Sequence, residues 1–423
     1  MSSVPTADRL RGSVPRVDHP SLWQRIWRPF WVLPFVIVLG AIALSWVLPW
    51  IDRNISHEIP YVFQGGPDGA RSLLSTIASA MISVTGLVFS ITMVVLQLAQ
   101  SQFTPRLLDS FLADRTTQAT LGVFTASFVY ALAVLRTVRG ENGDVEEFVP
   151  QLAVTAAFLL VLGAVAMFIA FIHNITTTVQ VTTVVNRVGT RTAHLIDEQF
   201  GPPGDAEGFG PTWSPRPDEE GVPLISRGRH GSLDHVDYPR LVSLARQHDV
   251  VVHLDVHLGS FIASGHRVGT VWGTAELDEE FRRSLDRTLG IVRTRTTLQD
   301  ISFGVRQLVD IAERALSPST NDPTTAIQVL DEIHMLLREL AVRRTISPYI
   351  VDEEDAVRVV TQPPTFVGIL DLALDEVLDY ADNTQVPKKL EEMLQDVLDV
   401  ARPENRGAVA AKLEQLRATA GPA

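Results

Sequence analysis

The chain has 423 residues and a formal net charge of −13, from 49 acidic and 36 basic residues. It contains no cysteine, which excludes disulfides, thiolate metal sites, iron–sulfur clusters and a cysteine nucleophile. The acidic balance argues against nucleic acid as a partner, because phosphate binding needs a basic surface.

Charged residues are sparse up to about residue 175 and return at the density of a soluble protein after about residue 187. The fold class that this predicts is an α-helical integral membrane protein with four transmembrane helices and a C-terminal α+β cytosolic domain. The expected parts are a cytosolic N-terminal segment, a transmembrane domain, a membrane-exit helix with a linker, a small β-rich unit and a helical cytosolic domain. Their expected bounds are 1–29, 30–175, 176–220, 221–275 and 276–423.

Four segments are long and apolar enough to cross a bilayer, which takes about 20 apolar residues in a helix. We expect spans over about 30–50, 72–105, 116–135 and 152–172. Tryptophans flank the first span at both ends, as is typical of the membrane interface. These are Trp23, Trp27, Trp31, Trp46 and Trp50.

Basic residues near the spans predict the orientation, because Lys and Arg are enriched on the cytoplasmic side. Five arginines precede the first span, and Arg187 and Arg191 follow the fourth. The acidic loop 141–147 is expected outside, although Arg136 and Arg139 at its start oppose this. We therefore expect a multi-pass protein of the bacterial plasma membrane with cytoplasmic N- and C-termini.

The second span has no charged residue or histidine between positions 72 and 105. As one helix its 34 residues would be about 51 Å long, against about 30 Å for a hydrocarbon core. Its small and polar residues recur in steps of 3 and 4, which is a heptad pattern. This polar seam consists of Thr76, Ser79, Ser83, Gly86, Ser90, Met93, Gln97, Gln100 and Thr104.

Two interpretations of the polar seam remain open. Copies of this helix around an axis would line a pore with hydroxyls and amides, with Met93 as an apolar constriction. Alternatively, the small residues only pack helices together in a non-conducting scaffold or sensor. The first interpretation predicts a homo-oligomeric channel whose partners are lipid, further copies of the chain and small inorganic ions. Asp109, Asp114 or the acidic outer loop would favour cations.

The region after the linker has β character. We expect strands over Val222–Ser226, Ser232–Asp237 and Val250–Leu258, with a short helix between the last two. The segment Gly259–Trp272 is similar to the glycine turn of biotinyl- and lipoyl-type barrels, which predicts a small β-barrel-like unit, although the turn has no lysine. His253, Asp255 and His257 share one strand face, where a solvated surface is favoured over metal binding, and we expect no metal or cofactor.

Residues 279 to about 340 are expected to be helical, and 363–419 to form two or three amphipathic helices. Arg306, Asp310 and Arg314 are spaced as an i, i+4 charge ladder. The turn before Pro323 contains Asn321 and Asp322, and Asp322 is a plausible N-cap for the next helix. These five residues are the candidates for a cytosolic binding or interface site, although turn chemistry alone explains the last two. No sequence motif of an enzyme is found, so an enzymatic function is not expected.

Two long segments carry a resemblance to a known family. They are SVTGLVFSITMVVLQLAQSQFTPR at 83–106 and QDISFGVRQLVDIAERALSPSTNDPTTA at 299–326. The chain resembles the bacterial membrane proteins classed as domain of unknown function 2254. The resemblance implies four membrane spans and a cytosolic domain, but no activity.

Overall fold

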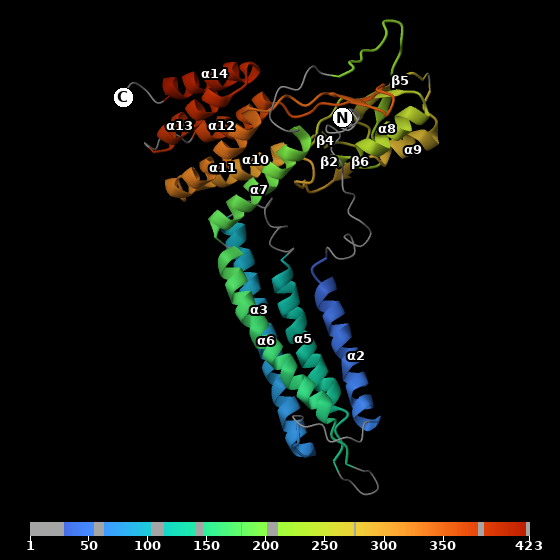
Figure 1. Ribbon diagram of the computed structural model, residues 1–423, viewed down its shortest axis with the longest axis vertical. Helices are drawn as coiled ribbons and strands as arrows, with labels where there is room; N and C mark the ends of the chain where they lie inside the picture. The colour runs from blue at the N-terminus through green and yellow to red at the C-terminus, as the bar shows by residue number, and fades with distance from the viewer. Residues whose placement is uncertain are drawn as a thin grey trace, which may run out of the picture. The chain divides into compact units, whose positions relative to one another are not determined.

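The computed structural model describes residues 29–54, 63–102, 114–140, 147–178, 180–200, 210–274, 276–379 and 385–419. The described residues up to Gln180 form one compact unit, and those from Val181 onward form the other (Figure 1). We call them the apolar-helix unit and the α+β unit. The expected N-terminal segment up to residue 28, Thr104, Asp109 and the acidic loop at 141–146 lie outside the described residues, as does the side chain of Gln100.

Four helices of the apolar-helix unit are long and apolar enough to cross a membrane, as the sequence predicts. They are α2 (Val32–Asn54), α3 (Pro67–Gln102), α5 (Arg115–Leu135) and α6 (Gln151–Thr178). Helix α5 lies among the others and contacts all three (Figure 1), and it is the most buried of the four. The other three expose most of their apolar side chains, which suits helices surrounded by lipid.

Polar contacts fix both ends of this bundle. At one end the carboxylate of Asp52 accepts N–H bonds from Leu152 (3.1 Å) and Ala153 (3.2 Å) at the start of α6. At the start of α5, Asp114 accepts the N–H of Thr117 (2.9 Å) and the side-chain amide of Asn174 (2.7 Å) on α6. Both carboxylates thus satisfy helix N–H groups that have no partner within the helix.

The α+β unit begins with helix α7 (Val181–Phe200), which follows α6 as a separate helix. This helix lies within the segment 176–220, where we expect a membrane-exit helix and a linker. The residues from Val181 onward form an amphipathic helix whose apolar side packs on α10 and α11. Its buried residues Val184, Val185 and Val188 recur at helical spacing.

Two open sheets occupy one part of the α+β unit. The larger has the order β1-β5-β3-β8-β7 and is antiparallel except where β3 and β8 pair in parallel. Its strands are β1 (Val222–Ile225), β3 (Val251–Leu254), β5 (Arg267–Trp272), β7 (Tyr349–Val351) and β8 (Val357–Val360). The smaller, antiparallel sheet has the order β4-β2-β6, with β2 (Gly231–Val236), β4 (Phe261–Ile262) and β6 (Leu289–Val292).

The expected β-barrel-like unit is therefore wrong. Neither sheet closes on itself, because each has two edge strands. The glycine-rich segment supplies β4 to one sheet and β5 to the other, so it separates two sheets instead of closing one. The larger sheet also contains β7 and β8, which lie within residues 276–423, where only helices were expected.

Seven further helices occur among the described residues of this unit. They are α8 (Tyr238–Gln247), α9 (Glu279–Asp286), α10 (Ile301–Leu316), α11 (Pro323–Ala341), α12 (Phe366–Leu378), α13 (Gln385–Val400) and α14 (Pro403–Thr419). Helix α10 lies at the centre of the helical layer and packs on α7, α11 and α12. Its apolar stripe is buried at Ile301, Val305, Leu308, Ala312 and Ala315.

Candidate functional site

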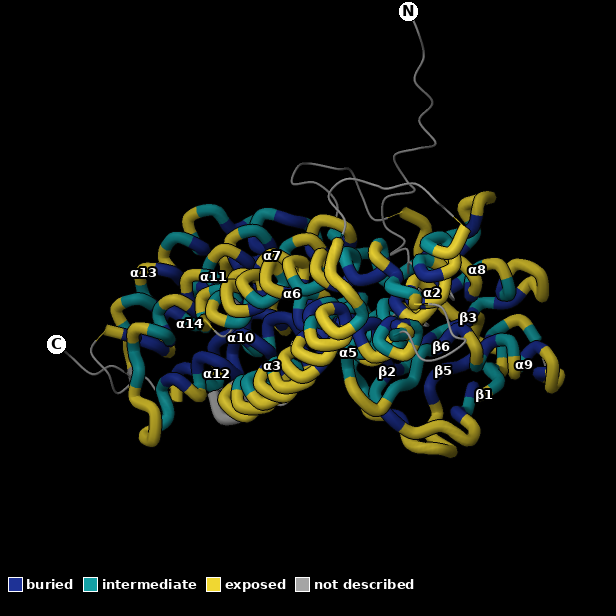
Figure 2. The backbone as a smooth tube through the Cα atoms, turned by 90° about the horizontal axis from the view of Figure 1, so that it is seen from below, coloured by how far each residue is buried: buried dark blue, intermediate teal, exposed yellow. Residues whose placement is uncertain are grey.

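The polar seam lies on the outward face of α3. The opposite face packs against α5 through buried residues that include Leu74, Ile77, Met81 and Val88. Figure 2 shows α3 exposed along most of its length. Every seam residue whose side chain is described is exposed in the single chain, namely Thr76, Ser79, Ser83, Gly86, Ser90, Met93 and Gln97. The contacts within the chain therefore leave the whole described seam uncovered.

Three hydroxyls of the seam donate hydrogen bonds to their own helix. Thr76 donates to the carbonyl of Ser72 (2.8 Å), Ser83 to that of Ser79 (2.9 Å), and Ser90 to that of Gly86 (2.9 Å). Such back-bonding leaves each hydroxyl oxygen able to accept a bond from outside the helix.

Gln97 differs from these residues. Its side chain is exposed, and its amide has no hydrogen-bond partner among the described residues. An amide left without a partner in hydrocarbon costs several kcal/mol, so this position needs water or protein beside it.

Apolar side chains flank the seam on the same exposed face. They include Ile82, Leu87, Phe89, Val94 and Leu98. A Cβ added at Gly86 would meet no atom within 4 Å, so the backbone there is open to close approach by another helix. The face thus combines a polar stripe with apolar ridges.

The predicted pair of Arg306 and Asp310 on α10 belongs to a larger, partly buried cluster. The Nε of Arg306 donates to Asp310 (2.8 Å), and its Nη1 donates to Glu376 (2.5 Å) on α12. Its Nη2 lies 3.5 Å from the carboxylate of Glu313. Arg314, the third residue of the expected ladder, is exposed. The sequence did not reveal Glu376, because it is 70 residues away along the chain.

Burial and a neighbouring acid change the pKa of Glu313. Burial, together with the neighbouring Glu376 carboxylate, raises the pKa of Glu313 to about 7, while Arg306 opposes the shift. The hydrogen bond to Glu376 raises the pKa of Arg306. One carboxyl between α10 and α12 therefore changes its protonation near neutral pH.

The predicted N-cap at Asp322 is confirmed. Its carboxylate accepts the backbone N–H of Thr325 (3.1 Å) and the hydroxyl of the same residue (2.6 Å). Those hydrogen bonds hold the pKa of Asp322 below its usual value. Asn321 precedes it with φ +46°, a conformation that asparagine tolerates well. The turn is thus explained by helix capping, and its carboxylate is already used.

The three strand residues considered for a metal do not converge. Asp255 pairs with Arg267 at 2.9 Å, and His253 lies 3.7 Å from the same carboxyl group. His257 contacts Ser260 instead. No cluster of three potential metal ligands occurs among the described residues.

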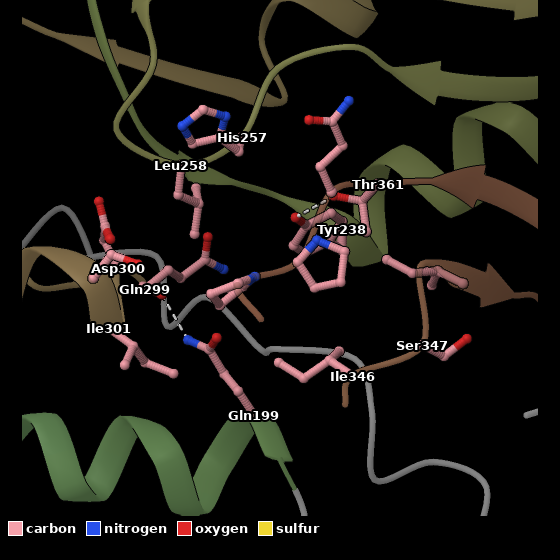
Figure 3. Close-up of a pocket in the computed structure, with 15 residues that line it drawn as sticks. Gln199, Tyr238, His257, Leu258, Gln299, Asp300, Ile301, Ile346, Ser347 and Thr361 are labelled. Atoms are coloured by element: carbon pink, nitrogen blue, oxygen red, sulfur yellow. Dashed lines mark hydrogen bonds between the residues drawn. The ribbon is translucent and has the colours of Figure 1, made fainter. Parts of the chain in front are cut away.

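The α+β unit contains a cavity of about 270 Å³ that the sequence did not predict (Figure 3). Its walls come from the end of α7, the start of α8, the segment after β3, the start of α10 and the segments that flank β7 and β8. The lining residues are Gln199, Tyr238, His257, Leu258, Gln299, Asp300, Ile301, Ser302, Ile346, Ser347, Ile350, Thr361, Gln362, Pro363 and Pro364. No local motif could have revealed it, because six separate segments supply these residues.

Known proteins resemble most of this chain. The family model described as "Predicted membrane protein (DUF2254)" matches residues 27–396. Uncharacterized proteins of Mycobacterium tuberculosis strains H37Rv and CDC 1551, and of Mycobacterium bovis, are 36% identical to it over 320 residues. This stretch covers 74% of the chain but only 60% of each relative. No solved structure matches the chain.

Proposed function

The chain belongs to the DUF2254 family of predicted membrane proteins, and we propose that it assembles into a homo-oligomeric channel for small ions. In this proposal α3 lines the conducting path and the α+β unit acts as a cytosolic assembly or gating element. The protein would lie in the bacterial plasma membrane as a multi-pass protein with both termini in the cytoplasm. No enzymatic role is proposed.

The exposed seam of α3 is the observation that carries the proposal. A polar stripe on a membrane helix is costly against lipid and favourable against water or another protein. The contacts of one protomer leave this stripe bare over its described length. Copies of α3 arranged around an axis would bring the stripes together and leave the apolar ridges for contacts between neighbours.

The chemistry of the seam suits ions that pass with much of their hydration shell. Hydroxyl oxygens that are bonded to their own helix keep lone pairs free to accept bonds from water. Charge selection must then come from residues outside the seam. Asp114 beside the start of α5 is one described acid near a helix end, and it supports a preference for cations.

A second candidate function is a non-conducting scaffold or sensor in which the seam only packs helices. The open backbone at Gly86 supports this alternative, as does the bonding of the Thr76, Ser83 and Ser90 hydroxyls to their own helix. Small residues four apart, such as Gly86 and Ser90, allow close helix contact without any water between the helices. Both candidates require self-association through α3. They differ in whether water fills the space between the α3 helices.

Self-association is tested by oxidative cross-linking in native membranes, which the absence of native cysteine makes simple. Ser83→Cys and Ser90→Cys are expected to form disulfide-linked dimers. Leu159→Cys and Ile169→Cys, on exposed positions of α6, serve as controls and should remain monomeric. Equal cross-linking at all four positions, or none on α3, would reject both candidates.

Conduction is tested by recording currents from the purified protein in planar bilayers. The wild type is expected to conduct, and Ser83→Leu or Gln97→Leu should reduce the unitary current strongly. Thr176→Leu is a matched control, because its hydroxyl is also exposed and bonded to its own helix, but on α6. Cross-linking on α3 without any current would favour the scaffold.

A further inference from the structure

Hydrogen bonds hold the walls of the cavity beside α10 in place. The side-chain amide of Gln299 accepts the N–H of Val236 (2.9 Å) and donates to the carbonyl of the same residue (3.2 Å). On another wall, the hydroxyls of Tyr238 and Thr361 lie 3.2 Å apart (Figure 3). Walls that are tied in this way give a cavity with a defined shape, as ligand sites usually have.

One buried polar side chain keeps unused hydrogen-bonding capacity at this cavity. Gln199 is only 6% exposed, and its amide nitrogen donates one bond to the backbone carbonyl of Gln299 (2.6 Å). Figure 3 shows this bond and the amide of Gln199 at the cavity wall. Its carbonyl oxygen has no partner among the described residues, and its second N–H is also unused. Such an amide offers a donor and an acceptor side by side.

The charges around the cavity indicate what kind of ligand fits. Among the described residues, no lysine or arginine lines it, and the histidine of the lining, His257, is exposed and contacts Ser260. The carboxylate of the described lining, Asp300, is already bound by the guanidinium of Arg295 and by the N–H of Phe303 (2.9 Å). Burial raises the pKa of Tyr238, so its hydroxyl is neutral. A charged ligand would find only the exposed imidazole of His257 to oppose its charge, so most of its desolvation would be uncompensated.

The remaining lining is apolar, with Leu258, Ile301, Ile346 and Ile350 among its residues. The hydroxyl of Ser302 at the start of α10 has no partner among the described residues. Apolar walls with a few hydrogen-bonding groups suit a heterocyclic ring, and a glutamine amide pairs with the donor and acceptor edge of such a ring. The volume of about 270 Å³ limits the ligand to about the size of a nucleoside.

We propose that this cavity binds an uncharged nucleobase or nucleoside, with the amide of Gln199 pairing to the edge of the base. This site lies wholly within the α+β unit, and it does not depend on whether α3 lines a channel. Binding there would order the end of α7 relative to α10, since residues of both helices line the cavity.

The proposal is tested by isothermal titration of the full-length protein in detergent with adenosine, guanosine, cytidine and uridine, and with their 5′-monophosphates. At least one nucleoside is expected to bind at sub-millimolar concentration, and its monophosphate should bind at least about tenfold more weakly. No binding by any nucleoside would overturn the proposal. Equal or tighter binding of the monophosphate would overturn the uncharged class.

Variants locate the site. Ser302→Phe fills the cavity and is expected to weaken nucleoside binding by at least about tenfold. Ser243→Phe makes the same exchange on an exposed face of α8 and should bind as the wild type does. Retained affinity in Ser302→Phe would place the ligand elsewhere. Circular dichroism of both variants checks that a loss of binding is not a loss of fold. Gln199→Leu removes the amide that is proposed to pair with the base, and it gives an independent second test of the site.

Discussion

Replacing Glu313 by glutamine should change how the stability of the α+β unit depends on pH. The side chain is 22% exposed, and its pKa is raised from the usual 4.5 to about 7, first by burial and then by Glu376. Between these two values the folded chain holds a proton that the unfolded chain has lost. The contribution of Glu313 to the free energy of unfolding is therefore full below pH 4.5, and it is lost as the pH rises through 7. The shift corresponds to about 3 kcal/mol.

Glu313→Gln removes the charge while keeping the shape of the side chain. Above pH 7 the variant should be more stable than the wild type by up to about 3 kcal/mol, and below pH 4.5 the two should nearly coincide. The assay is urea unfolding of the detergent-solubilised protein at several pH values, followed by circular dichroism. Glu392→Gln, on an exposed part of α13, is the control. If the free energies of unfolding of the wild type and Glu313→Gln differed by the same amount at every pH, the reasoning would be refuted.

Two further substitutions test the packing and the capping. A Cβ at Gly122 would lie 2.8 Å from the Ile37 side chain and 3.0 Å from the backbone of Pro34, so Gly122→Val should destabilise the α2–α5 contact by about 1–3 kcal/mol. Gly40→Val is the matched control, since a Cβ added at Gly40 would meet no atom within 4 Å. Thermal unfolding in detergent compares the two variants. Equal melting temperatures would contradict the close approach of α2 and α5 at Gly122. Asp322→Ala removes the α11 N-cap and should cost about 1 kcal/mol by urea unfolding; an unchanged midpoint would show that the cap contributes nothing.

The apolar helices were predictable because their signal is local. Runs without charge are long in this chain, and the length needed to cross a bilayer is set by the rise of a helix. The heptad spacing of small and polar residues on α3 was also visible in the sequence. The contacts on its opposite face were not, because they depend on α5, which lies further along the chain.

The sheets were harder to predict because their pairing is not local. Strands β6, β7 and β8 are only three or four residues long and lie among helices. So short an alternation of apolar and polar residues could not be distinguished from the helical pattern around it. The glycine turn after β3 suggested a barrel, but a turn motif does not specify which strand pairs with the free edge of β3. That edge is taken by β8, about a hundred residues later.

The most direct test of the account is the effect of a charged thiol reagent on currents through Ser90→Cys channels. The reagent is a methanethiosulfonate that carries a trimethylammonium group. If α3 lines the conducting path, its attachment at position 90 should reduce the cation current, and Leu159→Cys channels should be unaffected. A Ser90→Cys current that does not change, under conditions in which labelling of the cysteine is confirmed by mass spectrometry, would contradict a path along α3.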